Sequence, residues 1–284
     1  MMQSGRTAAQ DLEPRRWTLL PVGRTVVGIG YGQTVGDVFF DPVLLVENAE
    51  VEADSVILSY VRSFELADRS ARFDALIPWQ DARWSGLLQG EPAVVRRIGL
   101  ADPRFRLSIN LAGAPNPETA ESRDNTVVGA ALEVVIPVGE HLEDKLLNLG
   151  QNRFTIRPQM GFVHTRGPWS YELTGSVFLY SDNDEFFNGN RREQKPLYAL
   201  QTHLVRMFRP GLWVSLSAGY GWGARSEVND ERKDDEKGDF LAGLAVGFPV
   251  GRNQGMKLAY IRTRTRKDTG ADTDTLVLAW TMLY

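Results

Sequence analysis

Apolar side chains occupy every second position in several stretches of this chain. In Leu212–Trp222 one face carries Leu, Val, Leu, Ala, Tyr and Trp, and the other carries a Trp followed by Ser and Gly. Phe240–Phe248 and Thr275–Tyr284 repeat the pattern. Successive side chains of a strand point to opposite faces, so this alternation predicts β-strands with one strongly apolar face.

Twelve segments fit such a strand, some with weaker alternation. They are Val26–Thr34, Val56–Leu66, Arg72–Gln80, Phe105–Leu111, Val128–Ile136, Phe154–His164, Trp169–Leu179, Leu197–Phe208, Leu212–Trp222, Phe240–Phe248, Met256–Arg264 and Thr275–Tyr284. A tilted strand crosses a membrane in roughly 9–11 residues, close to the length of most of these segments. An even number of strands also suits a bacterial barrel with both termini on the periplasmic side.

The larger apolar and aromatic residues share one face of these segments, whereas Gly, Ser, Thr and charged residues share the other. A soluble barrel has the opposite arrangement, polar outside and apolar inside. We therefore predict an all-β fold, a single transmembrane antiparallel up-and-down β-barrel of about 12 strands. A soluble barrel or a sandwich remains the alternative.

The connections alternate in length, as the strands of such a barrel require. The predicted outer loops are mostly long and polar: Val35–Ser55, Asp81–Asp102, Val138–Arg153, Asp182–Pro196, Ala224–Asp239 and Lys267–Asp274. The predicted periplasmic turns are short, and most contain Gly or Pro: 67–69, 166–168, 209–211 and 250–254. Ala112–Asp124 is the exception, because it is long where a short turn is expected.

Composition narrows the function classes. No run approaches the about 18 apolar residues that a spanning helix needs. The net charge is -4 with scattered charges and no basic stripe, so we expect no nucleic-acid partner. The absence of cysteine excludes disulfides and thiolate chemistry. Asp182–Glu185 could hold a divalent ion, but its spacing does not match an EF-hand and a solvated loop is the simpler interpretation; we expect no metal and no cofactor.

We expect two parts in the chain. Residues 1–16 are an N-terminal remnant of a signal peptide or a periplasmic segment, and residues 17–284 form the barrel. Thr7-Ala8-Ala9 are small residues of the kind that precede a signal-peptidase cut, but no apolar stretch comes before them. We expect either a misplaced start or a nearly mature chain.

The inner face of the predicted barrel supplies candidate pore-lining residues. These are Arg72, Asp74, Arg104, Arg106, Glu133, Arg157, Gln159, Glu172, Gln201 and His203. In one interpretation their charges create a transverse field that orients polar solutes. In the other they form a salt-bridge network that seals a narrow lumen. Twelve strands lie between filled eight-stranded barrels and open sixteen-stranded ones, so the strand number does not decide between the two.

The predicted loop Gly36–Val51 is unusually apolar. Phe39, Phe40, Leu44 and Leu45 are candidates for a gate that folds into the barrel mouth. Alternatively, this loop lies in the lipopolysaccharide layer or forms an oligomer contact.

Two further hypotheses concern isolated polar residues. Arg62, Arg206 and Arg262 break the lipid-facing pattern, and at the outer rim they would meet lipopolysaccharide phosphates; a register shift or a bulge is the alternative. His203 with Ser215 and Ser217 is the only base–nucleophile pairing that the predicted inner face offers a hydrolase. Lumen-facing polar residues are common, so we do not predict an enzyme.

Several segments resemble the family of outer-membrane transporters called MetA-pathway of phenol degradation. The resembling segments are Gly36–Val51, Ser59–Pro92, Gly99–Pro115, Leu146–Phe162, Arg166–Phe187 and Phe208–Gly223, of which Leu146–Phe162 (LLNLGQNRFTIRPQMGF) is the best match. The resemblance implies a bacterial outer-membrane barrel that passes small solutes, aromatic or hydrophobic ones among them, with lipid and lipopolysaccharide as neighbours. A closed-lumen structural barrel is the alternative function, and the oligomeric state is open.

Overall fold

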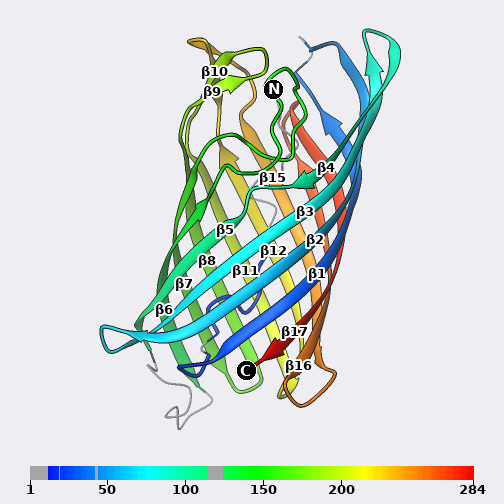
Figure 1. The fold of residues 1–284 in the computed structure, drawn as a ribbon. Coiled ribbons are helices and arrows are strands. Elements are labelled where there is room, and N and C mark those ends of the chain that lie inside the picture. The colour runs from blue at the N-terminus through cyan, green and yellow to red at the C-terminus, as the bar shows by residue number, and fades with distance from the viewer. Residues whose placement is uncertain (1–11, 19, 42–43, 114–123) are drawn as a thin grey trace.

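The computed structural model describes residues 12–18, 20–41, 44–113 and 124–284. Its main sheet runs in the order β2-β1-β17-β16-β15-β12-β11-β8-β7-β6-β5-β3-β4, and a pairing between β2 and β3 closes it into a barrel of tilted antiparallel strands (Figure 1). Within the described residues there is no helix long and apolar enough to cross a membrane. The all-β barrel that the sequence predicts is confirmed.

Among the described residues twelve strands form the closed wall, and each contains or overlaps one predicted segment. They are β1 (Thr25–Phe39), β2 (Val46–Leu66), β3 (Arg69–Leu88), β5 (Arg104–Ala112), β6 (Asn125–Val135), β7 (Thr155–Arg166), β8 (Trp169–Tyr180), β11 (Leu197–Arg209), β12 (Leu212–Gly223), β15 (Lys237–Pro249), β16 (Gln254–Thr265) and β17 (Gly270–Leu283). The tight turns between β2 and β3, β7 and β8, β11 and β12, and β15 and β16 gather at the end where the C-terminus lies (Figure 1).

The opposite end holds structure that the sequence analysis assigned to loops. β3 continues to Leu88 and turns back into β4 (Glu91–Leu100), so Asp81–Asp102 is mostly a hairpin. β9 (Asn183–Phe186), β10 (Asn190–Gln194), β13 (Ser226–Val228) and β14 (Glu231–Arg232) form a separate four-stranded sheet. Gln89 and Gly90 have φ of 53° and 84°, as a tight two-residue hairpin turn requires. Outer loops need no apolar face, so alternation could not reveal these strands.

The long connection Ala112–Asp124 joins β5 to β6 at the short-turn end. β5 ends at Ala112 and β6 begins at Asn125, and residues 114–123 lie outside the described part of the chain. Because it lies at the end where the other connections are short, this long connection remains the exception to the pattern.

The outer surface of the barrel wall is apolar and its inner surface is polar. Leu216 on β12 is 62% exposed and Leu244 beside it on β15 is 55% exposed, whereas Ser215 and Ser217 are buried inside. Large exposed side chains continue around the wall, including Leu58, Met160 and Tyr171. This is the arrangement of a barrel with hydrocarbon outside, as the sequence predicts.

Leu216→Arg should therefore destabilise the barrel in a bilayer by about 2–4 kcal/mol, because it places a charge in hydrocarbon near the middle of β12. Leu45→Arg should cost far less, since Leu45 is also well exposed, at 55%, but lies in the loop between β1 and β2. Equilibrium unfolding in lipid vesicles compares the two variants. Equal losses would contradict a lipid-facing surface at Leu216.

Two of the three pattern-breaking arginines lie at the short-turn end. Arg62 donates to Thr25 at 2.6 Å, and Arg206 lies over the rings of Trp169 and Phe208. Short turns lie on the periplasmic side of such barrels, so neither arginine lies at the outer rim that the lipopolysaccharide hypothesis requires. Arg262, near the other end of β16, lies 3.8 Å from an Asp274 oxygen.

Candidate functional site

The N-terminal residues 12–18 lie inside the barrel, and we call this segment the plug. It connects to β1 through residues 20–24, which are tied to the short-turn end. There Ser63 on β2 donates to the Pro21 carbonyl at 2.5 Å and accepts from the Arg24 N–H at 3.0 Å. The plug therefore enters the lumen from the periplasmic end.

The contacts of residues 12–16 bear on the expected division of the chain. Residues 12–16, which we expected in a separate periplasmic segment, lie within the barrel because their charges and backbone groups find partners on the inner wall. Met1–Gln10, with the small residues that suggest a signal-peptidase cut, lies outside the described residues.

The inner wall carries a row of alternating charges on four neighbouring strands. Asp74 on β3, Arg106 on β5, Glu133 on β6 and Arg157 on β7 are successive register partners. Glu133 forms ion pairs with both arginines, with N–O distances of 3.4 Å to Arg106 and 3.5 Å to Arg157. At the end of the row the Arg157 guanidinium lies 4.3 Å from the centre of the Phe178 ring.

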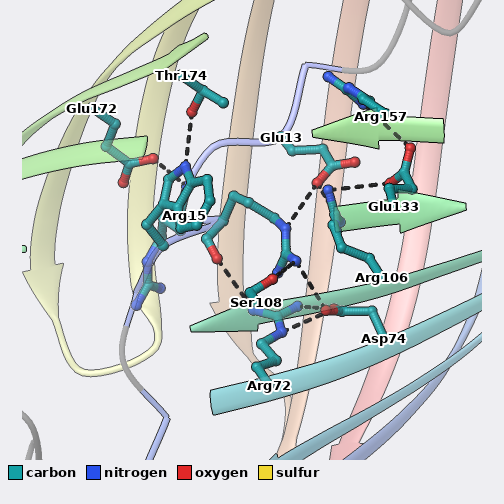
Figure 2. A network of polar contacts seen from close by, with 12 residues as sticks. Glu13, Arg15, Arg72, Asp74, Arg106, Ser108, Glu133, Arg157, Glu172 and Thr174 are labelled. Atoms are coloured by element: carbon teal, nitrogen blue, oxygen red, sulfur yellow. Dashed lines mark hydrogen bonds and ion pairs between the residues drawn. The ribbon is translucent and has the colours of Figure 1, made fainter. Parts of the chain in front are cut away.

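The plug adds its own charges to this row. The Glu13 carboxylate accepts a hydrogen bond from Arg106 Nη2 at 2.7 Å, and it lies on the side of Arg106 away from Glu133 (Figure 2). Arg16 Nη2 lies 3.0 Å from an Asp74 oxygen and donates to Ser108 Oγ at 2.6 Å. The five charged side chains among them are largely shielded from solvent, and Glu13 is the most exposed of these.

The charges of the plug complement those of the wall. In this region Arg72, Arg106 and Arg157 outnumber Asp74 and Glu133, and Arg72 is itself committed to Asp74 at 2.5 Å. A buried charge without a partner is costly, and the plug supplies a carboxylate, Glu13, to Arg106 and a guanidinium, Arg16, to Asp74. The ionic contacts thus bind the plug to one place in the lumen.

A second set of contacts holds Arg15, in the middle of the plug, and Leu12, at its N-terminal end. The Arg15 N–H donates to a Glu172 oxygen at 2.8 Å, and its guanidinium lies over the Trp213 ring at 5.4 Å (Figure 2 labels Arg15 and Glu172). Leu12 packs over Gly219 and Gly243, where an added Cβ would meet its methyl groups at 3.1 and 2.8 Å. These glycines leave the room that Leu12 occupies.

Trp17 fills a flat recess in the wall. Its ring lies against the backbone of Gly129 on β6 and Gly161 on β7, where an added Cβ would come within 2.6 and 1.9 Å of ring atoms. Its Nε1 donates to Thr174 Oγ1 at 2.8 Å. Buried Val127, Ala131 and Val163 pack around the ring.

A small cavity lies beside the plug. A cavity of about 30 Å³ remains between Arg16, Trp17 and the wall residues Ser70 and Ser108, enough for about one water molecule. The inner wall around Glu133, Thr174 and His203 is buried. In this conformation the plug occupies part of the lumen and lies directly against these wall residues.

The predicted pore-lining residues all lie on the inner face. Those with buried side chains are Asp74, Arg106, Glu133, Arg157, Gln159, Glu172, Gln201 and His203; Arg72 and Arg104 are partly exposed. The structure brings most of them together around the plug. Their role in passing a solute stays a prediction.

Sequence reasoning missed Glu13, Arg16 and Trp17. The segment has no strand periodicity and precedes the first strand, so it carried no fold signal. The excess of arginine on the inner wall was the one available sign that a carboxylate from elsewhere is needed.

The predicted gate loop is mostly strand. β1 extends to Phe39 and β2 begins at Val46, and Pro42 and Val43 of the remaining loop lie outside the described residues. Phe40 is buried and Leu44 packs beside it, whereas Phe39 and Leu45 are 38% and 55% exposed. The segment continues the wall outward because its alternation matches a β1–β2 pairing. Of the four gate candidates, Phe40 and Leu44 pack into the apolar cluster at this end.

An apolar cluster lines the mouth in place of the expected loop. It contains Val38, Phe40, Ala49, Val51, Ala82, Trp84, Ala101 and Leu149. Leu149 comes from the connection between β6 and β7, which Asp102 anchors by accepting the N–H groups of Gly139 at 2.9 Å and Gln151 at 2.7 Å. Burial raises the pKa of the Asp102 carboxyl, and these two donors oppose the rise.

The candidate base and nucleophile are in contact beneath the plug. His203 Nδ1 lies 2.8 Å from Ser217 Oγ, and both side chains are buried. Glu172 is the register partner of His203, but its carboxylate accepts the Arg15 N–H. In the outer loops Asp182 and Asp184 pair with Arg191, and the described residues contain no group of three or more His, Cys, Asp or Glu side chains suited to a metal.

Comparison with solved structures identifies the fold. The crystal structure of a COG4313 outer membrane channel from Pseudomonas putida F1 matches with a TM-score of 0.81 and 21% identity, over 96% of this chain and 100% of that chain. The KdgM porin (TM-score 0.47, 10% identity, 90% of this chain and 98% of that one) is less similar. So is the CymD monoaromatic hydrocarbon channel (0.44, 6%, 93% and 89%). This chain therefore has the fold of an outer-membrane β-barrel.

Comparison with curated proteins gives no significant match. Comparison with protein families does. The family described as "Putative MetA-pathway of phenol degradation" matches residues 27–276, from the first barrel strand to the last. The chain belongs to this family.

Proposed function

We propose that this protein is a passive outer-membrane channel for small solutes, aromatic or hydrophobic ones among them, and that the plug holds it closed. The observation that carries the proposal is that a separate segment, residues 12–18, occupies part of the lumen. A twelve-stranded barrel has an interior between the filled eight-stranded and the open sixteen-stranded kinds. The space that the plug occupies is the space that a solute would use.

Small wall residues support this proposal. Gly129, Gly161, Gly219 and Gly243 all face the plug, and an added Cβ at any of them would contact it. A wall that sealed its own lumen would need large side chains at such positions. Departure of the plug would therefore leave an open path between the charge row and the strands on the opposite side.

The connection to β1 supports a movement toward the periplasm. Residues 20–24 hold the plug at the periplasmic rim, and Gly23 adopts a φ of 84° with no atoms near the position of a Cβ. A rotation about this connection withdraws the plug without disturbing any strand.

Family membership supports the proposed solute class. The family description refers to phenol degradation, which supports a small aromatic cargo. A polar inner face and an apolar mouth also suit a solute with both a ring and a polar group.

Planar-bilayer recording and vesicle uptake test the proposal together. Purified protein should show brief current steps, since the plug leaves the lumen only part of the time. Vesicles containing the protein should take up 4-hydroxybenzoate, an aromatic anion that crosses lipid slowly, faster than vesicles without it. A folded protein that stays silent and passes no solute, even after the plug is released by mutation, would overturn the proposal.

A closed structural barrel is the second candidate, and the paired charges inside the lumen favour it. The same recordings distinguish it, because it predicts silence in every variant. A hydrolase is not proposed: the contact between His203 and Ser217 lies beneath the plug, and the neighbouring carboxylate of Glu172 is bonded to the plug backbone.

A further inference from the structure

The recess that holds Trp17 has the features of a binding site for an aromatic solute. Its floor is the backbone of Gly129 and Gly161, which carry no side chain, and its rim is apolar. A flat floor without side chains accepts a ring face-on. The recess is defined by Gly129, Gly161, Thr174, Val127 and Val163, and we call it the ring slot.

The ring slot also selects for one polar group. Thr174 Oγ1 accepts the Trp17 N–H at 2.8 Å and is buried, so an occupant without a donor would leave that oxygen without this hydrogen bond. The slot therefore matches an arene of one or two fused rings that carries a single N–H or O–H at its edge. Trp17 shows that such a group fits.

We propose that the ring slot is a solute subsite of the channel and that Trp17 is its internal occupant. A solute arene competes with Trp17, and occupancy by the solute favours release of the plug. This inference rests on the proposed function, since a solute reaches the slot only in a barrel that opens.

The competition has a defined geometry. Trp17 enters the slot from the plug, so its ring must leave before a solute ring can lie on Gly161. A ligand that binds only the plug-free state shifts the equilibrium toward that state in proportion to its concentration. An aromatic solute would thus increase its own passage.

Indole is a suitable probe, because it is the ring system of Trp17 without the chain. Full-length Trp17→Ala vacates the slot and should bind indole saturably at one site. Adding Gly161→Ala places a methyl group where the ring lies and should weaken binding by about tenfold or more. Adding Gly175→Ala instead should change nothing, because Gly175 lies on the adjacent strand β8 and faces open space outside.

Binding is measured by equilibrium dialysis against nanodiscs, with heat-modifiable gel mobility to confirm that each variant is folded. Indene, which lacks the N–H, should bind more weakly than indole. Equal indole binding by all three variants would show that indole merely dissolves in the lipid, and would overturn the inference, as would no binding by any folded variant.

Current recording separates this inference from the proposed function. If a plug-released barrel conducts but Trp17→Ala binds no indole, the channel stands and the ring slot fails. If indole binds with the predicted dependence on Gly161 but no variant conducts, the proposed function fails, and the inference that rests on it fails too.

Discussion

Arg16→Ala combined with Trp17→Ala is expected to open the barrel, raising its mean current in planar bilayers by at least about tenfold. The two changes remove the contacts of Arg16 with Asp74 and Ser108 and the seat of Trp17 on Gly161. Each lost interaction shifts the balance between the bound and released plug, while every strand stays intact.

The matched control is Arg206→Ala with Trp169→Ala. This pair also joins an arginine to a tryptophan ring, at 5.2 Å, but it lies at the periplasmic end of β11 and β8, with Arg206 exposed. Its current should equal that of the unchanged protein. If the control conducts as strongly as the plug variant, loss of an arginine–tryptophan pair anywhere loosens the barrel and the plug has no special role.

Glu133→Gln should lower the free energy of unfolding by about 3 kcal/mol. Glu133 is fully buried and pairs with both Arg106 and Arg157. Its neutral replacement therefore leaves these two buried cations without the carboxylate that they share. The amide has nearly the same volume, which isolates the loss of charge from any loss of packing.

Glu52→Gln is the control, because Glu52 is exposed and its N–O distance to Arg83 is 3.8 Å. An exposed pair of this kind contributes about 0–1 kcal/mol, so the control should unfold almost like the unchanged protein. Denaturant unfolding in lipid vesicles compares them. Indistinguishable midpoints for the two variants would mean that water screens the charge row and that the lumen is open.

The barrel wall could be predicted from sequence because the membrane imposes the pattern. Leu216 and Leu244 must face hydrocarbon while Ser215 and Ser217 face inward, and that constraint repeats along every spanning strand. Above the membrane it disappears. The extension of β3 through Trp84, the strand β4 and the outer four-stranded sheet were missed for this reason.

The candidate site could be predicted only in part. The inward charges Asp74, Arg106, Glu133 and Arg157 follow from alternation, but their partners depend on a segment without periodicity. A seven-residue plug has no face to maintain, and its contacts are spread over strands about 60 to 230 residues away in sequence, such as those of Asp74 and Gly243. Only the three-dimensional fold brings Glu13 to Arg106.

The most direct test of the account locks the plug in place. The chain has no cysteine, so Leu12→Cys with Gly243→Cys introduces a unique pair at a contact where a Cβ at position 243 lies 2.8 Å from Leu12 Cδ1. In the Arg16→Ala, Trp17→Ala background, a short reversible thiol cross-linker should abolish the current, and reduction should restore it. Current that persists through a plug shown to be cross-linked would contradict the claim that this segment closes the channel.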